Sequence, residues 1–112
     1  MSAVDEILID IEEGNNNYFD WSHTLIIGND AIKYHQIVII KKKSASVVGE
    51  TENEVWVDIE KKNLNNKSIQ DLEKFLKSQD SDERFDKFKS YLDKNNIKFK
   101  KGDWQSFDTF DT

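Results

Sequence analysis

The sequence of 112 residues contains no cysteine and no proline, and its four glycines are scattered. Without cysteine the chain cannot form a disulfide framework, offer a thiol nucleophile or bind a metal through thiolates. It also has no glycine-rich loop of the kind that binds phosphates. Its longest apolar run, residues 37–40, is far shorter than the roughly 20 residues that cross a bilayer. The N-terminus lacks the pattern of a signal peptide. We therefore expect a soluble cytoplasmic protein.

Basic residues are missing from both ends of the chain. The net charge of −6 comes from 22 acidic and 16 basic residues. Residues 1–32 carry seven acidic side chains and residues 102–112 carry three, and neither segment contains Lys or Arg. Direct binding to nucleic acid is not expected, since that affinity comes largely from neutralising phosphates with Lys and Arg. Two interpretations are open: the acidic ends solvate the protein, or they fold together into one surface for a basic partner.

The first half of the chain has the pattern of an antiparallel meander. Residues 7–12 alternate and are rich in β-branched side chains, which favours a strand with an acidic outer face. A helix over the same segment is the alternative, since Val4, Ile7, Leu8 and Ile11 have helical spacing. Three further apolar segments, separated by Gly- and Asn-rich turns, predict three more strands. They lie at residues 25–27, 36–43 and 55–59.

The hydrophobic period changes from two to 3.6 after Asn66. Ser68 can cap a first helix with Asp71 at its third position, and Asp80 with Glu83 can cap a second. Residues 97–100 alternate again and predict a last strand. The predicted fold class is α+β, in a single domain over residues 1–112. A mostly antiparallel sheet of four to five strands carries two helices of the C-terminal half on one face.

The sequence offers little for catalysis. The only histidines are His23 and His35, and we expect both to be ordinary surface or sheet-edge residues. A catalytic pair of His23 with Asp20 stays open, because triads are built in space rather than by sequence order. The acidic run at residues 80–83 lacks the glycine and the distal Glu of an EF-hand. We predict no catalytic residue, no cofactor and no metal.

The last eleven residues combine three large aromatic side chains at a spacing of three with three Asp, and have no aliphatic residue. In one interpretation Trp104, Phe107 and Phe110 fold back as an acidic aromatic tail and complete the core. In the other they form an interface, because aromatic residues supply binding hot spots and acids pair with Lys or Arg of a partner. Residues 18–21 repeat the same aromatic and acidic chemistry near the other end.

A protein that presents carboxylates in place of phosphates and rings in place of bases can block the basic cleft of a nuclease. In size, acidity and lack of catalytic motifs the chain resembles bacterial immunity proteins, although no motif ties it to one family. We therefore predict a non-catalytic inhibitor of a basic protein, most plausibly a toxin domain. A phage- or plasmid-encoded inhibitor of a host defence enzyme and a structural domain without inhibitory role are the alternatives. The predicted partner-binding residues are Glu12, Glu13, Asp20, Trp21, Asp103, Trp104, Phe107, Asp108, Phe110 and Asp111.

Overall fold

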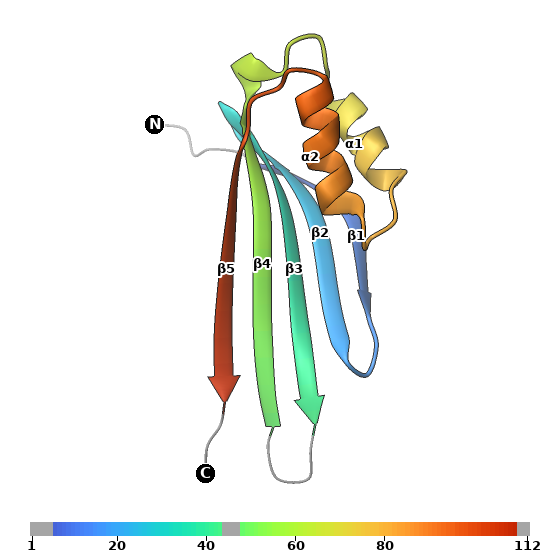
Figure 1. Cartoon of the computed structure of the whole chain (residues 1–112), viewed down its shortest axis with the longest axis vertical. Coiled ribbons are helices and arrows are strands. Elements are labelled where there is room, and N and C mark those ends of the chain that lie inside the picture. Colours follow the sequence, from blue (N-terminus) through green and yellow to red (C-terminus); the bar gives the residue numbers. More distant parts are fainter. Residues whose placement is uncertain (1–5, 44–47, 110–112) are drawn as a thin grey trace.

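The computed structural model describes the backbone of residues 6–43 and 48–109, and the side chains of residues 6–41 and 51–105. Five strands form one antiparallel sheet in which each strand pairs with its neighbour in the sequence (Figure 1). The predicted meander and the α+β class are confirmed. The strands, in sequence order and in order across the sheet, are β1 (Ile7–Asn15), β2 (Phe19–Ile27), β3 (Ala31–Lys43), β4 (Val48–Glu60) and β5 (Lys100–Thr109).

The first element is a strand, and a β-bulge interrupts its alternation. Unbroken alternation would place Ile9 and Ile11 on one face and Glu12 on the other. The register with β2 instead shifts between Asp10 and Glu12, which adds one residue to β1. Ile11 then packs against the core, and Glu12, which lies opposite the buried His23, points to the same face. The predicted acidic outer face of this strand therefore loses Glu12 to the inner face.

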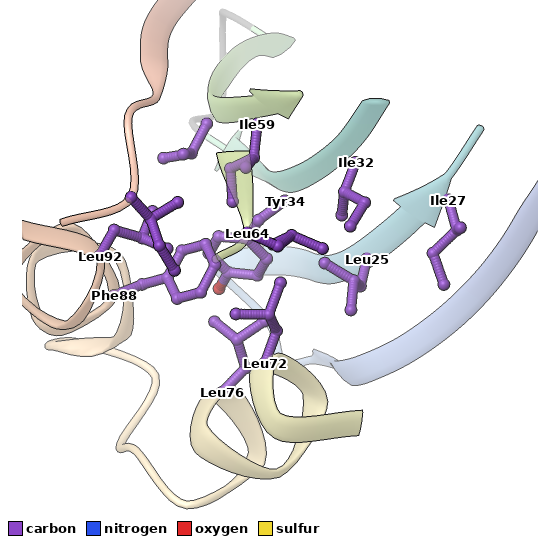
Figure 2. Close-up of a cluster of buried hydrophobic side chains, with 12 residues drawn as sticks. Leu25, Ile27, Ile32, Tyr34, Ile59, Leu64, Leu72, Leu76, Phe88 and Leu92 are labelled. Carbon is purple, nitrogen blue, oxygen red and sulfur yellow. The ribbon is translucent and has the colours of Figure 1, made fainter. Parts of the chain in front are cut away.

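Both helices lie against one face of the sheet, as predicted (Figure 1). After β4 the chain forms the 3-10 turn η1 (Lys61–Asn63), then α1 (Ile69–Lys77) and α2 (Arg84–Lys94). Their apolar side chains meet those of β2, β3 and β4 around Tyr34, whose ring centroid lies 5.3 Å from that of Phe88 (Figure 2). Each fully buried aliphatic or aromatic side chain stabilises the fold by about 1.5–3 kcal/mol. The core consists of Leu25, Ile27, Ile32, Tyr34, Val57, Ile59, Leu64, Leu72, Leu76, Phe88, Leu92 and Ile97.

The two predicted helix caps differ in outcome. The Ser68 hydroxyl accepts a hydrogen bond from the Asp71 amide, and the Asp71 carboxylate accepts one from the Ser68 amide. This reciprocal pair confirms the first cap. The second is wrong, because α2 begins only at Arg84 and Glu83 at its N-cap makes no side-chain hydrogen bond. Asp80 belongs to a turn before the helix, where its carbonyl accepts a hydrogen bond from the Glu83 amide.

The last strand also begins later than predicted. Residues 97–100 were expected to form it, but β5 starts at Lys100, and Ile97 is buried in the core before the strand begins. The described part of the acidic aromatic segment is therefore not a folded-back tail. It is an edge strand that pairs with β4 from Asp58 to Gly49.

The helices cover only one end of the sheet. β3 and β4 have 13 residues each and span about 44 Å, whereas the 11 residues of α2 span about 16 Å. The radius of gyration is 16.3 Å, compared with about 13 Å for a globular chain of this length. Beyond the helices the sheet continues as a single layer (Figure 1). No helix in residues 6–43 and 48–109 is long and apolar enough to cross a membrane.

Candidate functional site

The residues predicted to bind a partner lie at opposite edges of the sheet. Glu12 and Glu13 belong to the edge strand β1, and Asp20 and Trp21 to β2 beside it. Of the C-terminal group, Asp103, Trp104, Phe107 and Asp108 belong to β5, the other edge. With a strand spacing of about 4.8 Å, the two edge strands are about 19 Å apart. The described residues of the two acidic ends therefore do not meet as one compact cluster.

The strand register divides these residues between the two faces. Trp21 and Glu12 lie on the face that carries the helices, and the Trp21 indole donates a 2.9 Å hydrogen bond to the Glu12 carboxylate. Glu13 and Asp20 point to the opposite face, where Asp20 forms an ion pair with Lys41 at 2.9 Å. The N-terminal group is therefore split equally between the two faces of the sheet.

The C-terminal group is divided in the same way. Asp103 lies on the helix-bearing face, and Trp104 on the opposite one. The Trp104 side chain is 49% exposed, so the interpretation that it completes the core is wrong. Phe107 and Asp108 pair with Thr51 and Glu50 in the backbone register. Their side chains, together with Phe110 and Asp111, lie outside the described residues.

We call the side of the sheet that the helices leave open the helix-free face. Its described side chains include seven carboxylates, three lysines, one histidine and two tryptophans, together with aliphatic residues of β1, β2 and β3. The excess of carboxylates gives this face a negative charge, although it carries both signs. The charged and aromatic members are Asp10, Glu13, Asp20, Lys33, His35, Lys41, Glu52, Glu54, Trp56, Asp58, Glu60, Lys100 and Trp104.

Trp56 is fixed at the centre of a small cluster on the helix-free face. The Lys33 Nζ lies 5.6 Å from the centroid of its indole, and the His35 ring meets it edge-on at 6.2 Å. The His35 Nε2 in turn lies 2.7 Å from the Glu54 Oε1. A β-carbon at Gly102 on the neighbouring strand would lie only 2.4 Å from the indole, so the ring covers this glycine.

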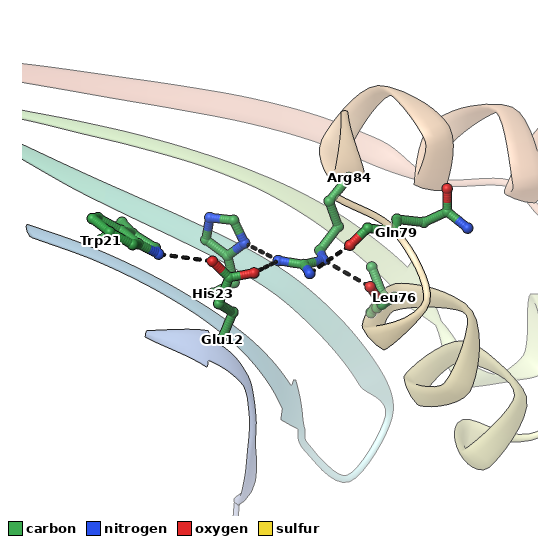
Figure 3. A network of polar contacts seen from close by, with 6 residues as sticks. All are labelled: Glu12, Trp21, His23, Leu76, Gln79 and Arg84. Atoms are coloured by element: carbon green, nitrogen blue, oxygen red, sulfur yellow. Dashed lines mark hydrogen bonds and ion pairs between the residues drawn. The ribbon is translucent and has the colours of Figure 1, made fainter. Parts of the chain in front are cut away.

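The helix-bearing face contains a buried polar network around Arg84 (Figure 3). Arg84 is 3% exposed and is the only arginine of the sequence. Its Nε donates to the Leu76 carbonyl at 2.7 Å and its Nη2 to the Gln79 carbonyl at 2.6 Å. Its Nη1 lies 2.9 Å from the Glu12 Oε1 and 2.7 Å from the His23 Nδ1. One side chain thus joins β1 and β2 to the turn between the helices.

The expectation that His23 is a surface residue is wrong, since it is 4% exposed. A guanidinium can only donate hydrogen bonds, so the Nδ1 of His23 must accept and the ring is neutral with its proton on Nε2. Burial and then the adjacent Arg84 lower the pKa of His23 below its ordinary value. Burial tends to raise the pKa of Glu12, but hydrogen bonds from Trp21 and Arg84 outweigh it and the pKa falls.

The choice of basic residues in the sequence contains a signal for this network. Fifteen of the sixteen basic residues are Lys, and the single exception is Arg84. A guanidinium presents five N–H groups in a fixed plane, whereas an ammonium is a compact charge on a flexible stem. A lone Arg in a lysine-rich sequence therefore indicates a position where that planar geometry is needed.

The chemistry available to the described residues is that of binding and structure. His35 is oriented by the Glu54 carboxylate. A histidine held by a carboxylate is one of the components that a hydrolytic triad requires. No hydrogen bond from a nucleophilic hydroxyl to this ring is present among the described side chains. An open groove of about 980 Å³ near the end of β4 is lined by residues of both charges, including Asp58, Glu60 and Lys98. The described residues contain no group of three potential metal ligands.

The sequence matches no protein-family model. No curated protein and no solved structure matches the chain either.

Proposed function

We propose that the chain is a non-catalytic binding protein that inhibits a basic protein partner through its helix-free face. The partner that fits best is a nuclease-type toxin domain, which the chain would neutralise in the cytoplasm as an immunity protein. The observation that carries the proposal is the helix-free face itself. It presents seven carboxylates and a half-exposed tryptophan on a sheet surface that the chain's own helices leave uncovered.

The size of the helix-free face supports a role as an interface. Five strands at about 4.8 Å spacing make it about 24 Å wide, and its shortest strands span about 30 Å. The resulting area of roughly 700 Å² or more approaches the 800 Å² per partner of a standard protein interface. A single partner can therefore contact both edge strands at once, although they do not touch each other.

The side chains of the helix-free face suit a nucleic-acid-binding cleft. Such clefts hold phosphates with Lys and Arg and stack bases on aromatic rings. Carboxylates at Asp10, Glu13 and Glu52 can take the place of phosphates, and Trp104 can occupy the place of a base. Opposite charge also accelerates encounter, which matters when the target is toxic to the cell.

The test compares two triple variants that change the net charge equally. Asp10→Asn, Glu13→Gln and Glu52→Gln alter the helix-free face, and the control Asp80→Asn, Asp82→Asn and Asp93→Asn alters exposed residues of the helical layer. Association with the product of the neighbouring gene, which the proposal predicts to contain a basic nuclease domain, is measured by surface plasmon resonance. Inhibition of its nuclease activity is measured in parallel.

We expect the wild type to bind and inhibit. We expect the triple variant of the helix-free face to associate about tenfold more slowly at low salt. We expect the control variant to keep the wild-type rate. Equal slowing of both variants would show that only total charge matters. A wild-type chain that neither binds nor inhibits would refute the proposed function.

A further inference from the structure

We infer that Trp104 is the anchor of the helix-free face and receives an arginine side chain of the partner, between its indole and the carboxylates of Glu52 and Glu54. This inference rests on the proposed function and adds to it one contact of defined chemistry.

Two of the three tryptophans pack over a glycine of the adjacent strand. Trp21 of β2 covers Gly14 of β1, and Trp56 of β4 covers Gly102 of β5. A β-carbon at Gly14 would lie 2.3 Å from the Trp21 ring, and one at Gly102 would lie 2.4 Å from the Trp56 ring. At each edge of the sheet, an indole from the inner neighbour thus lies over a glycine, an arrangement that stabilises edge glycines.

Trp104 has no such position. It belongs to the edge strand itself and is 49% exposed, which makes it the only one of the three tryptophans among the exposed large hydrophobic residues. Leaving an indole in water forgoes the burial of a large apolar surface. A tryptophan that packs poorly within its own chain is typical of a residue that packs against a partner.

The neighbours of Trp104 define the kind of group that it would bind. Glu54 lies directly opposite in the register of β4 and β5, and Glu52 lies on the diagonal. Side chains in these two positions are within reach of a large aromatic residue. An aromatic face beside two carboxylates attracts a cation by its ring quadrupole and by charge together.

The three lysines whose side chains are described on the helix-free face each lie beside or opposite another residue of that face. Lys33 lies over Trp56, Lys41 pairs with Asp20, and Lys100 lies opposite Asp58 in the register. Lys100 is also four residues before Trp104, which is about 13 Å along the strand. The cation for the Trp104 position therefore has to come from outside the described part of the chain.

The cluster around Trp56 shows how this face receives a cation. There an indole accepts the Lys33 ammonium while the nearby Glu54 carboxylate accepts a polar contact from His35. A guanidinium suits the Trp104 position better than an ammonium. It stacks flat on an indole while its N–H groups reach two carboxylates at the edge of the ring.

The test uses the full chain and an oligo-arginine peptide as the probe. The three tryptophans give three indole N–H signals in a ¹H–¹⁵N spectrum, and the Trp104→Ala variant identifies one of them. We expect the Trp104 signal to shift most on addition of the peptide. We expect Trp104→Ala to weaken peptide affinity about tenfold. Retention of the other two indole signals shows that the variant is folded.

Phe19→Ala is the matched control, because Phe19 is a similarly exposed aromatic residue, 41% accessible, on the helix-bearing face. It should leave the affinity unchanged. A largest shift at Trp21 or Trp56, or equal affinities of the two alanine variants, would overturn the inference. An oligolysine peptide of the same length that binds as tightly would overturn the assignment of a guanidinium.

The toxin assay separates this inference from the proposed function. If Trp104→Ala inhibits the nuclease at the same concentration as the wild type, the inference fails and the proposed function stands. If no basic nuclease domain is inhibited while the peptide still shifts the Trp104 signal, the proposed function fails and the arginine site stands.

Discussion

Arg84 makes more polar contacts than any other side chain described. It uses four of its five N–H groups on two backbone carbonyls, a carboxylate and a histidine. The carbonyls of Leu76 and Gln79 close the end of α1, while Glu12 and His23 belong to β1 and β2. The guanidinium therefore fixes the turn between the helices against the N-terminal edge of the sheet.

We predict that Arg84→Met lowers the free energy of unfolding by about 3 kcal/mol. Removing one partner of a buried ion pair leaves the charge of the other partner uncompensated. Glu12 would lose its ion pair, and two carbonyls would lose their donors. Urea denaturation measures the loss. Lys74→Met, which removes the same charge from an exposed position of α1, is the control and should change stability by less than about 0.5 kcal/mol. Equal effects of the two substitutions would contradict the structural role of Arg84.

His23 gives the protein a pH dependence of stability. Its pKa in the folded state lies below the ordinary value of 6.5, because burial and Arg84 disfavour the charged ring. Between these two values the unfolded chain binds more protons than the folded one, so stability decreases as the pH decreases. We predict full stability above about pH 7 and a decline as the pH falls through about 6.5.

Urea denaturation at about pH 7.5 and about pH 5.5 checks this window, which lies above the range in which the Glu12 carboxylate titrates. His23→Gln should abolish the decline, and His35→Gln should retain it. An undiminished decline in His23→Gln would assign the pH dependence to other groups.

At the scale of the elements, the edge strands show how this sheet protects its ends. β1 and β5 each contain one glycine that lies under a tryptophan of the adjacent strand. The two pairs lie on opposite faces, since Trp21 shares the helix-bearing face and Trp56 the helix-free face. Each indole extends across the pairing of the last two strands and adds side-chain contact where the sheet has no further neighbour.

We predict that Gly102→Ala lowers the free energy of unfolding by about 1–3 kcal/mol, because the new methyl group would collide with the Trp56 ring. In the double variant Trp56→Leu with Gly102→Ala, the smaller side chain leaves room for the methyl group. The double variant should therefore lose less stability than the sum of the two single variants. Strict additivity in a double-mutant cycle would show that the indole does not lie over Gly102.

At the scale of the whole molecule, the sheet has two different halves. The half near the turn between β2 and β3 carries the helices and all the buried sheet side chains of the apolar core. The other half has intermediate exposure along β3, from Ile37 to Lys41. One half therefore provides stability, and the other provides surface on both sides of a single layer.

We predict that amide hydrogen exchange follows this division within one strand. Residues 32–35 and 37–40 of β3 are both paired with β2 and β4, so their backbone hydrogen bonding is comparable. Only the first group lies in the core half, and its protection factors should exceed those of the second by tenfold or more. Equal protection along β3 would mean that the sheet opens only as one unit.

The sequence determined much of this fold, because its signals are local. Alternation predicted the meander, the change to helical period predicted both helices, and the Ser68 and Asp71 pair predicted the first cap. The second cap and the start of the last strand were wrong. The residues near residue 82 are compatible with more than one start of α2, and those after residue 96 with more than one start of β5. Packing against the core determines where each element begins.

The candidate site depended far more on tertiary structure. The sequence identified acidic and aromatic ends, but only the strand order placed them at opposite edges, and only the bulge in β1 put Glu12 on the helix-bearing face and Glu13 on the other. Arg84 meets its strand partners across 61 and 72 residues of sequence. Such contacts follow from register and layer packing, which no local pattern encodes. The same register decided that Trp104 faces outward beside Glu54 while the other two tryptophans cover glycines.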